Sequence, residues 1–430
     1  MPPRGQVEWR HWLKHKDLYG PLSSVTALGQ TIVVIHDKQA ALELMEKRAV
    51  SHSGRPSATF AMEMKQKLED LCMVASMLLK MIYGYRVEKD KPDPLVEIND
   101  LLVDIFASAT VPGAWLVDTV PWFKHVPGWM PGTNFKDVAR KAQLVVTAAA
   151  RIPFRFAKQQ EETNGTTKRN PCLVSEILRT TQDAKIISDE DIQWTAASLY
   201  GAGVDTTGST LRTFFLAMSK CPDVQKRSQQ EIDKVVGAER LPGQGDRASL
   251  PYINAVVKEC LRWLPSVPLG IPHAAEADDE LHGFRIPKGA ILMPSTWWFT
   301  RDPSVYHDPE KFLPERYLAP FEEPDPASFV FGFGRRICPG RRLAEATVFL
   351  TIAKVLAVFN ISKALDDVGR EVEPEIGVGP GAVASPLPFS VVVEPRSGAA
   401  AQLVCSIQAE HQSEEGDAKH LDEDVSHLFH

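Results

Sequence analysis

Long apolar stretches without proline alternate with short segments rich in proline and glycine along this chain of 430 residues. Within the long stretches, apolar residues recur every three or four positions, which places them on one face of a helix. This pattern predicts helices at residues 188–220, 251–264 and 341–359. A further helix is expected at residues 37–48, with Asp37 as its N-cap. Ser188 and Asp191 form a capping box at the start of the longest one, and Pro222 follows its end. That helix would be about 50 Å long, so we expect its middle to be buried.

The composition agrees with a soluble enzyme that has one large core. Hydrophobic residues make up 44% of the chain, which suffices for a single extended core. We expect one domain over residues 1–408 and an acidic, disordered tail over residues 409–430, where seven acidic residues accompany one lysine. The net charge of −7 therefore comes mostly from the tail. The nearly neutral remainder gives no indication of nucleic-acid binding.

The six cysteines show no CxxC pair and no regular spacing. Such a distribution favours a reducing compartment over a secreted scaffold held by disulfides. No apolar run reaches the roughly 18 residues that a membrane-spanning helix requires. We therefore expect free thiols and no transmembrane segment.

Candidate chemistry is concentrated around Cys338, in the stretch Phe-Gly-Phe-Gly-Arg-Arg-Ile-Cys-Pro-Gly at residues 331–340. A cysteine thiolate pushes electron density onto haem iron and favours O–O cleavage. Gly334 and Gly340 can adopt positive φ, so the backbone can fold tightly around the sulfur. The predicted helix that follows favours the thiolate at its N-terminus, and Arg336 can pair with a haem propionate. The alternative is a buried cysteine in an ordinary glycine-rich loop.

The middle of the longest predicted helix carries Asp205 next to Thr206. A carboxylate beside a hydroxyl is costly in a buried helix unless it serves a function. Gly203, which has no Cβ, would leave room for a small ligand beside the backbone. We interpret the pair as a proton-delivery site. The alternative is a core helix whose threonines hydrogen-bond to carbonyls of the preceding turn.

Glu259 and Arg262 lie three positions apart, on one face of the helix predicted at residues 251–264. Isolated pairs of this kind are usually solvated, but the apolar residues around this pair favour burial. Arg316, within the sequence Pro-Glu-Arg-Tyr, can complete a Glu–Arg–Arg network. Such a network would hold the cysteine loop in place.

In this order, the motifs resemble those of the cytochrome P450 family of haem-thiolate monooxygenases, and of its fungal members in particular. The similarity covers about residues 19–404 and implies a mainly α fold, a helical haem domain with small β-sheets. It implies that Cys338 is the axial ligand of the iron of haem b. By position, the resemblance also assigns proton delivery to Asp205 and Thr206, contacts with the haem to Phe331, Gly334, Arg336, Gly340 and His273, and a structural network to Glu259, Arg262 and Arg316.

The resemblance further implies that one atom of O₂ enters a lipophilic small molecule, in fungal secondary metabolism. Electrons would come from NADPH through cytochrome P450 reductase. Arg335, Arg341 and Arg342 would form the docking surface for this acidic partner, with solvated arginines at a helix start as the alternative. We expect a cytoplasmic protein or one associated with the surface of the endoplasmic reticulum. Residues 111–133, rich in proline and tryptophan, either contact a bilayer surface or pack over the substrate pocket.

One departure from the family pattern affects these expectations. After their first helix, family members carry a substrate-facing loop and a helix with the motif Trp-x-x-x-Arg that binds a propionate. Here no tryptophan lies between Trp12 and Trp115. Residues 51–64 lead directly into residues 68–85, which resemble a much later family helix and are therefore expected to be helical. We therefore expect an internal deletion near residues 60–70. The alternative to an active monooxygenase is an inactive or non-catalytic haem-binding remnant.

Overall fold

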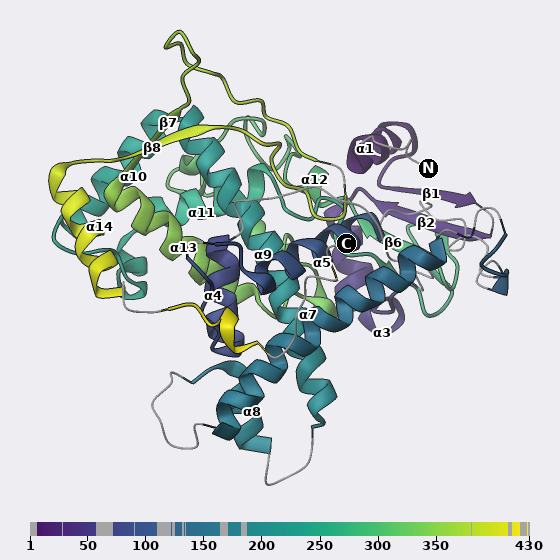
Figure 1. Cartoon of the computed structure of the whole chain (residues 1–430). Coiled ribbons are helices and arrows are strands. Elements are labelled where there is room, and N and C mark those ends of the chain that lie inside the picture. Colours follow the sequence, from purple (N-terminus) through teal and green to yellow (C-terminus); the bar gives the residue numbers. More distant parts are fainter. Residues whose placement is uncertain are drawn as a thin grey trace. The chain divides into compact units, whose positions relative to one another are not determined.

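The structure is a computed structural model that describes residues 7–27, 29–56, 72–89, 91–109, 122, 125–130, 133, 135–163, 171–181, 187–379, 381–411, 415–421 and 428. Helices dominate, as Figure 1 shows, which confirms the predicted mainly α fold class. The chain forms two compact units, Met1–Ser57 with Ser209–Gln408, and Ala58–Gly208 with Ala409–His430. The organisation of residues 1–408 as a single domain stays a prediction.

The first unit combines helices with three small sheets. Its helices are α1 (Glu8–Tyr19), α2 (Lys38–Leu42), α3 (Ala49–His52), α10 (Pro222–Val235), α11 (Pro251–Trp263), α12 (Thr296–Phe299), α13 (Arg341–Val358) and most of α14 (Gly398–His411). Its strands are β1 (Leu22–Ala27), β2 (Gln30–Ile35), β3 (His273–Ala274), β4 (Asp279–Leu281), β5 (Phe284–Ile286), β6 (Ile291–Pro294), β7 (Phe359–Lys363) and β8 (Val391–Pro395). Short helical turns are η1 (Glu43–Lys47, a π-helix), η4 (Gln244–Ser249), η5 (Pro314–Tyr317), η6 (Pro326–Ser328) and η7 (Gly334–Arg336).

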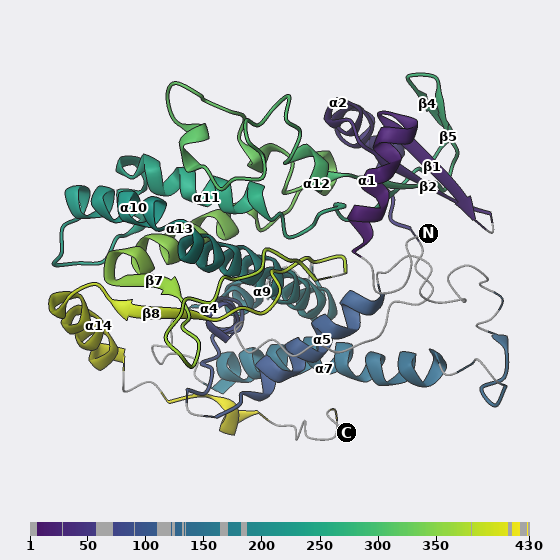
Figure 2. The same ribbon diagram turned by 90° about the horizontal axis from the view of Figure 1, so that it is seen from above.

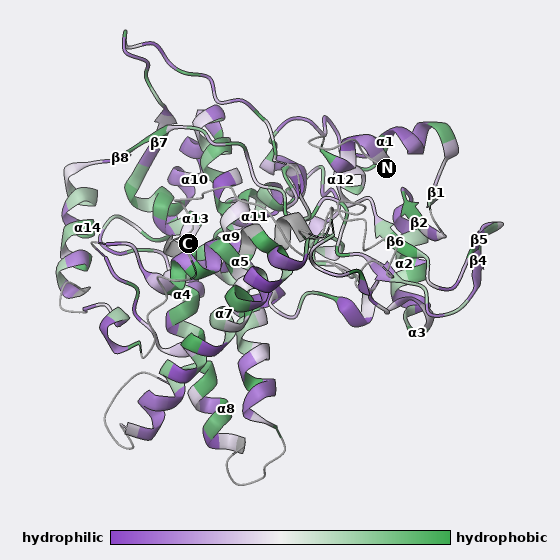
Figure 3. Cartoon of the chain, turned by 45° about the vertical axis from the view of Figure 1, so that its right-hand side comes forward, coloured by the Kyte–Doolittle hydropathy of each residue, from purple (hydrophilic) through white to green (hydrophobic). Residues whose placement is uncertain are grey.

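The largest sheet has the order β1-β2-β6-β3, with β2 and β6 parallel and the other neighbours antiparallel. Strand β2 lies between two others and its last four residues are buried, as expected for a strand of valine and isoleucine. Figure 3 accordingly shows β2 as hydrophobic and the β4–β5 hairpin as hydrophilic. Ile35 of this sheet packs in one core cluster with Leu44 of η1 and with Phe333, which precedes η7. The sheet therefore supports the loop that leads to Cys338.

Helices α10, α11 and α13 lie side by side in the first unit (Figure 2). Proline stands in the first turn of α10 and of α11, where its missing N–H costs no intrahelical bond. The carboxylate of Glu231 on α10 accepts the N–H groups of Tyr252 and Ile253, at 2.8 and 2.9 Å. These are donors that the start of α11 would otherwise leave unpaired. The contact fixes the helix that carries Glu259 and Arg262.

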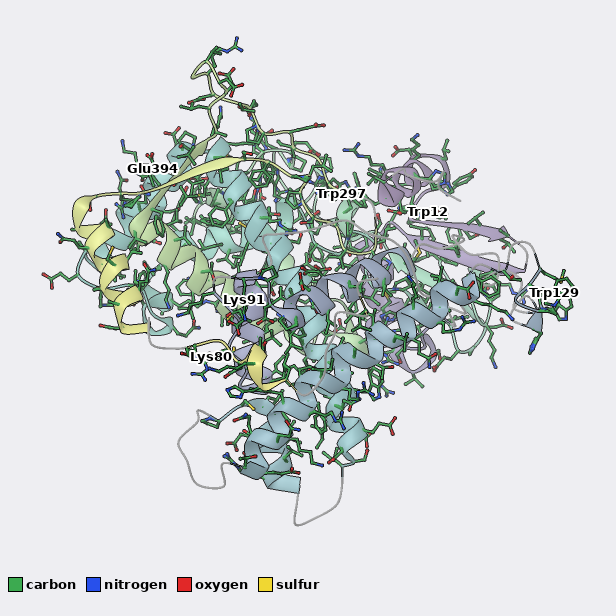
Figure 4. All side chains as sticks on the ribbon, viewed as in Figure 1. Trp12, Lys80, Lys91, Trp129, Trp297 and Glu394 are labelled. Carbon is green, nitrogen blue, oxygen red and sulfur yellow. The ribbon has the colours of Figure 1, made fainter. Side chains whose placement is uncertain are left out.

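Aromatic contacts attach α1 to the rest of the first unit. The rings of Trp9 and Trp297 lie 5.2 Å apart, and Figure 4 shows Trp297 near the helix that carries Trp12. The guanidinium of Arg301 lies over the Trp297 ring, 3.4 Å from its centroid. Burial lowers the pKa of Arg301 to about 9, and the aromatic face compensates for part of the lost hydration of this cation.

The helix predicted at residues 37–48 begins as predicted, because the Asp37 carboxylate accepts the N–H of Ala40 at 2.7 Å. It continues as α2 and then widens into the π-helix η1. The next predicted helix forms as α4 (Cys72–Tyr83). Residues 57–71, and with them the predicted deletion, lie outside the described residues.

The second unit consists of helices. They are α4, α5 (Pro94–Ala109), α7 (Phe135–Thr163), α8 (Leu173–Thr181) and the part of α9 (Asp189–Lys220) that precedes Ser209, together with the short turn η8 (Ala418–His420). The capping box at the start of α9 is confirmed: the Asp191 N–H donates to Ser188 Oγ at 3.1 Å, and the Ser188 N–H donates to the Asp191 carboxylate at 3.3 Å. The predicted length of this helix is confirmed as well.

Part of the acidic C-terminal segment is packed against the second unit. The buried carboxylate of Asp417 accepts the backbone N–H, Nε and Nη2 of Arg86 at 3.0, 3.2 and 2.9 Å. The Asp417 N–H in turn donates to the Arg86 carbonyl at 2.9 Å. Residues 415–421 are therefore held by a specific ion pair. The predicted disorder of the remaining tail stays a prediction.

No helix within the described ranges is long and apolar enough to cross a membrane. Most of residues 111–133 lies outside the described residues, but Trp122 and Trp129 within that segment are exposed. Their membrane contact stays a prediction.

Candidate active site

Cys338 lies in the short connection between η7 and α13, in the first unit. Its N–H donates to the Phe331 carbonyl at 2.8 Å, and its own carbonyl accepts the N–H of Arg341 at 3.3 Å. The thiol is free and half-buried. Because α13 begins at Arg341, the sulfur lies near the positive end of an 18-residue helix.

Gly334 explains why the cysteine loop fits closely onto η1. Its φ is +52°, and a Cβ there would lie 2.6 Å from the carbonyl oxygen of Met45. The expected positive φ is wrong for Gly340, whose φ is −84°. A Cβ at Gly340 would lie 3.9 Å from Cys338 Sγ, so glycine keeps the sulfur uncovered on that side without being required by its conformation.

Phe331 and Arg341 cover the base of the loop. The Arg341 guanidinium lies 5.5 Å from the centroid of the Phe331 ring. The same guanidinium donates to the carboxylate of Glu345 at 3.0 Å, on the first turns of α13. The aromatic ring is thus held between the cysteine backbone and a paired arginine.

Basic side chains gather beside this loop on two carbonyls at the end of α3, those of His52 and of Ser53. Arg336 Nε donates to the Ser53 carbonyl at 2.9 Å, and His273 Nδ1 donates to the His52 carbonyl at 2.8 Å. Burial, and to a lesser extent the positive charges of Arg55 and Arg336, lower the pKa of His273 to about 4. The structure therefore brings the two predicted propionate contacts, Arg336 and His273, together.

Arg55 is a third basic residue at this place that the sequence did not single out. Its guanidinium donates to the carbonyls of Ile271 and Pro272 at 3.2 and 2.7 Å. Burial, and then the charge of Arg336, lower the pKa of Arg55. Neither Arg55 nor Arg336 forms an ion pair with any acid in the described part of the chain. Repelling cations without an acid partner favour an anionic ligand, which a haem supplies with its two propionates.

Glu259, Arg262 and Arg316 meet in a fully buried network of the first unit. Arg262 binds the Glu259 carboxylate through Nε and Nη2, both at 2.8 Å. Arg316 donates from Nε to Glu259 at 3.1 Å and from Nη1 to Glu323 at 2.6 Å. The structure thus joins α11 to η5. The role of this network in holding the cysteine loop stays a prediction.

Asp205 and Thr206 belong to the second unit, and both are half-buried on α9. Thr206 Oγ1 donates to the carbonyl of Ala202 at 2.8 Å. This is the contact expected for a core helix whose threonines hydrogen-bond to carbonyls of the preceding turn. The donation leaves the lone pairs of the hydroxyl oxygen able to accept a hydrogen bond. Burial of the middle of α9 holds for Val204 and Thr207, whereas Ala202 is exposed.

The expectation that Gly203 leaves room for a small ligand is wrong. A Cβ at Gly203 would lie 2.9 Å from Leu78 Cδ1, so α4 packs directly against the α9 backbone at this point. The absence of a Cβ at residue 203 leaves room for the Leu78 side chain. A single sequence does not distinguish these two uses of the residue.

A cysteine at a helix start, with two arginines and a buried histidine nearby, fits a thiolate-bound haem, and comparison with known proteins decides the family. The sequence model of Cytochrome P450 matches residues 58–391, more than half of the chain. The chain belongs to the cytochrome P450 family. It is therefore a monooxygenase that uses haem b, takes electrons from NADPH through a redox partner, and acts on a lipophilic small molecule.

Known relatives of this P450 come from several fungi. It is 38% identical to the cytochrome P450 monooxygenase CLM2 of Gibberella zeae, over 99% of this chain and 92% of the relative. It is 40% identical to the cytochrome P450 monooxygenase claR of Ampulloclitocybe clavipes, over 96% and 87%. It is 34% identical to O-methylsterigmatocystin oxidoreductase of Aspergillus flavus, over 97% and 89%. Similarity over nearly the full length of both chains favours an active P450 over a remnant.

The same comparisons agree with a shortened chain. The alignment with the Gibberella zeae protein is 485 positions long, although this P450 has 430 residues. The relative therefore contains residues without a counterpart here. The position of the difference stays a prediction, because the expected site lies outside the described residues.

Proposed function

We propose that this P450 inserts one atom of O₂ into a lipophilic metabolite of a fungal secondary pathway, with Cys338 as the axial thiolate. The observation that supports this assignment most strongly is the setting of Cys338. Its backbone is fixed by the Phe331 carbonyl, the preceding Gly334 fits against η1, and α13 begins three residues after it. A thiolate-bound haem supplies the activation of O₂.

Arg336, His273 and Arg55 would hold the haem by its propionates. Arg336 keeps its two terminal nitrogens for an anion, because its Nε is engaged by Ser53. His273 donates through Nδ1, so its Nε2 is the nitrogen that faces a ligand. An anion at Nε2 would raise the pKa of His273 and make that nitrogen a donor.

Asp205 and Thr206 would handle protons. The overall reaction consumes O₂, two electrons and two protons, and yields the hydroxylated product and one water. Asp205 would pass protons inward from solvent, since the residue is half-buried. Thr206 would accept a hydrogen bond through its oxygen, because its own proton is given to Ala202.

The redox partner would be a cytochrome P450 reductase that docks beside the cysteine loop. Arg335 is exposed on this surface, and Arg341 and Arg342 follow at the start of α13. Arg341 is already paired with Glu345, so Arg335 and Arg342 would contribute most of the attraction to an acidic partner. We assign the protein to the cytoplasm or the cytoplasmic surface of the endoplasmic reticulum.

The test is the CO difference spectrum of the dithionite-reduced, haem-loaded chain. We expect a thiolate-type Soret band in the natural chain and in the Cys405→Ser variant, whose cysteine is exposed on α14. Cys338→Ser should lose that band. Absence of haem from the natural chain, an imidazole-type band, or a thiolate band in Cys338→Ser would overturn the assignment.

A further inference from the structure

Residues 51–55 form a short segment that is paired with the sheet. The Ser51 carbonyl accepts the N–H of Glu276 at 2.7 Å, and the Gly54 carbonyl accepts the N–H of Ala274 at 2.9 Å. A Cβ at Gly54 would lie 2.9 Å from the Ala274 carbonyl oxygen. The segment is therefore pressed against the edge of the sheet, next to β3.

The two carbonyls at the centre of this segment orient the two predicted propionate contacts. That of His52 accepts His273 Nδ1 at 2.8 Å, and that of Ser53 accepts Arg336 Nε at 2.9 Å. Both side chains are thus oriented by adjacent peptide groups. A shift of this one segment would move both of them together.

The side chain of His52 fixes the same segment from the opposite direction. It is fully buried, and its Nε2 lies 2.8 Å from Oδ2 of Asp279 on β4. The other oxygen of Asp279 accepts Arg48 Nη1 at 2.7 Å, and Arg48 Nε donates to Glu43 on η1 at 3.2 Å. A chain of charge-assisted hydrogen bonds therefore runs from η1 through β4 to His52.

We propose that His52 is a positioning residue for haem binding, which holds residues 52 and 53 so that His273 and Arg336 face the propionates. The inference rests on the proposed function. The contacts of His273 and Arg336 with the propionates would matter more in this chain than in other family members. The reason is that the family's propionate-binding Trp-x-x-x-Arg helix has no match here, since no tryptophan lies between Trp12 and Trp115.

Two variants of His52 separate this role from simple packing. His52→Phe fills the buried site but removes the donor to Asp279. His52→Gln keeps a donor and serves as the rescue. Glu280→Gln is the matched control, because Glu280 is the next acid on β4 and its side chain is exposed.

The measurement is the rate at which the full-length, haem-loaded chain transfers haem to apomyoglobin. His52→Phe should release haem about tenfold faster than the natural chain. His52→Gln should release haem at nearly the natural rate, and Glu280→Gln at the natural rate. The same rates are then measured with haem dimethyl ester, whose propionates are neutral. If His52 acts through the propionates, its effect should disappear with the ester.

Two results would overturn the inference: haem release from His52→Phe at the natural rate, or an acceleration of equal size with the ester. If His52→Phe does not fold, as judged by circular dichroism, Asp279→Asn takes its place. This variant weakens the same contact from a less buried position and is measured with both haem and haem dimethyl ester. Failure of the proposed function would be visible separately, because the natural chain would then lack the thiolate-type CO spectrum before any His52 variant is compared.

Discussion

Glu259→Gln is expected to destabilise this P450 strongly although it conserves the size of the side chain. The fully buried Glu259 carboxylate accepts hydrogen bonds from Arg262 at 2.8 Å twice, from the Leu313 N–H at 2.8 Å, from the Tyr317 hydroxyl at 3.0 Å and from Arg316 at 3.1 Å. All these partners are donors. The amide nitrogen of a glutamine would therefore face a donor in either orientation.

The size of the effect follows from what the two arginines retain. Removing one partner of a buried ion pair costs about 3–5 kcal/mol. Arg316 keeps the Glu323 carboxylate at 2.6 Å, and Arg262 keeps the carbonyls of Thr300, Pro309 and Lys311. We therefore expect the lower end of that range, about 3 kcal/mol.

The assay is urea unfolding at pH 7, followed by far-UV circular dichroism, on the natural chain and two variants. The control is Glu310→Gln, because the Glu310 side chain is 79% exposed and lies 3.6 Å from Arg301. It should change the free energy of unfolding by less than about 1 kcal/mol. If Glu259→Gln also stayed within about 1 kcal/mol of the natural chain, the argument that Glu259 compensates two buried cations would be refuted.

Three further predictions concern other parts of the molecule. Thr206→Ala should lower product formation by about tenfold or more while peroxide release per NADPH rises, whereas the buried neighbour variant Thr207→Ala should keep the natural ratio of product to peroxide. Burial lowers the pKa of His36 to about 4, so between pH 6.5 and about 4 the unfolded chain binds a proton that the folded chain does not. The contribution of His36 to stability should therefore be complete above pH 6.5 and be lost as the pH falls to about 4. In His36→Gln, the urea midpoint of unfolding should fall less over this pH range. Asp417→Ala should speed hydrogen exchange at the Arg86 amide by about tenfold, because it removes a charged acceptor of that N–H; an unchanged rate would show that the C-terminal contact does not protect it.

The ends of the helices were predictable because local chemistry marks them. The capping box of Ser188 and Asp191, the carboxylate of Asp37, and the prolines at residues 222 and 251 act within one helical turn. Such signals need no knowledge of the remaining chain. The π-helical turn η1 was not predictable in this way, because it arises where the cysteine loop packs on Met45.

The geometry of the site was less predictable, because it depends on segments that are far apart in sequence. Arg336 is oriented by Ser53, and Arg55 by the carbonyls of Ile271 and Pro272. The sequence predicted a role for Arg336 from a local motif. Nothing local distinguishes Arg55 from other loop arginines, so its place in the cluster emerged from the structure alone.

The Glu259 network and the His52–Asp279 contact are expected to affect two different properties of the P450, the stability of its fold and its retention of haem. The Glu259 network joins α11 to η5 through buried charges and does not contact residues 51–55, so its loss should appear as lower stability. His52 and Asp279 lie at the edge of the sheet and act on two carbonyls, so their loss should appear as faster haem release from a chain that is still folded. Because Arg48 and Asp279 belong to the second group and are partly exposed, we expect substitutions of these two residues to change the rate of haem release without disturbing the buried network.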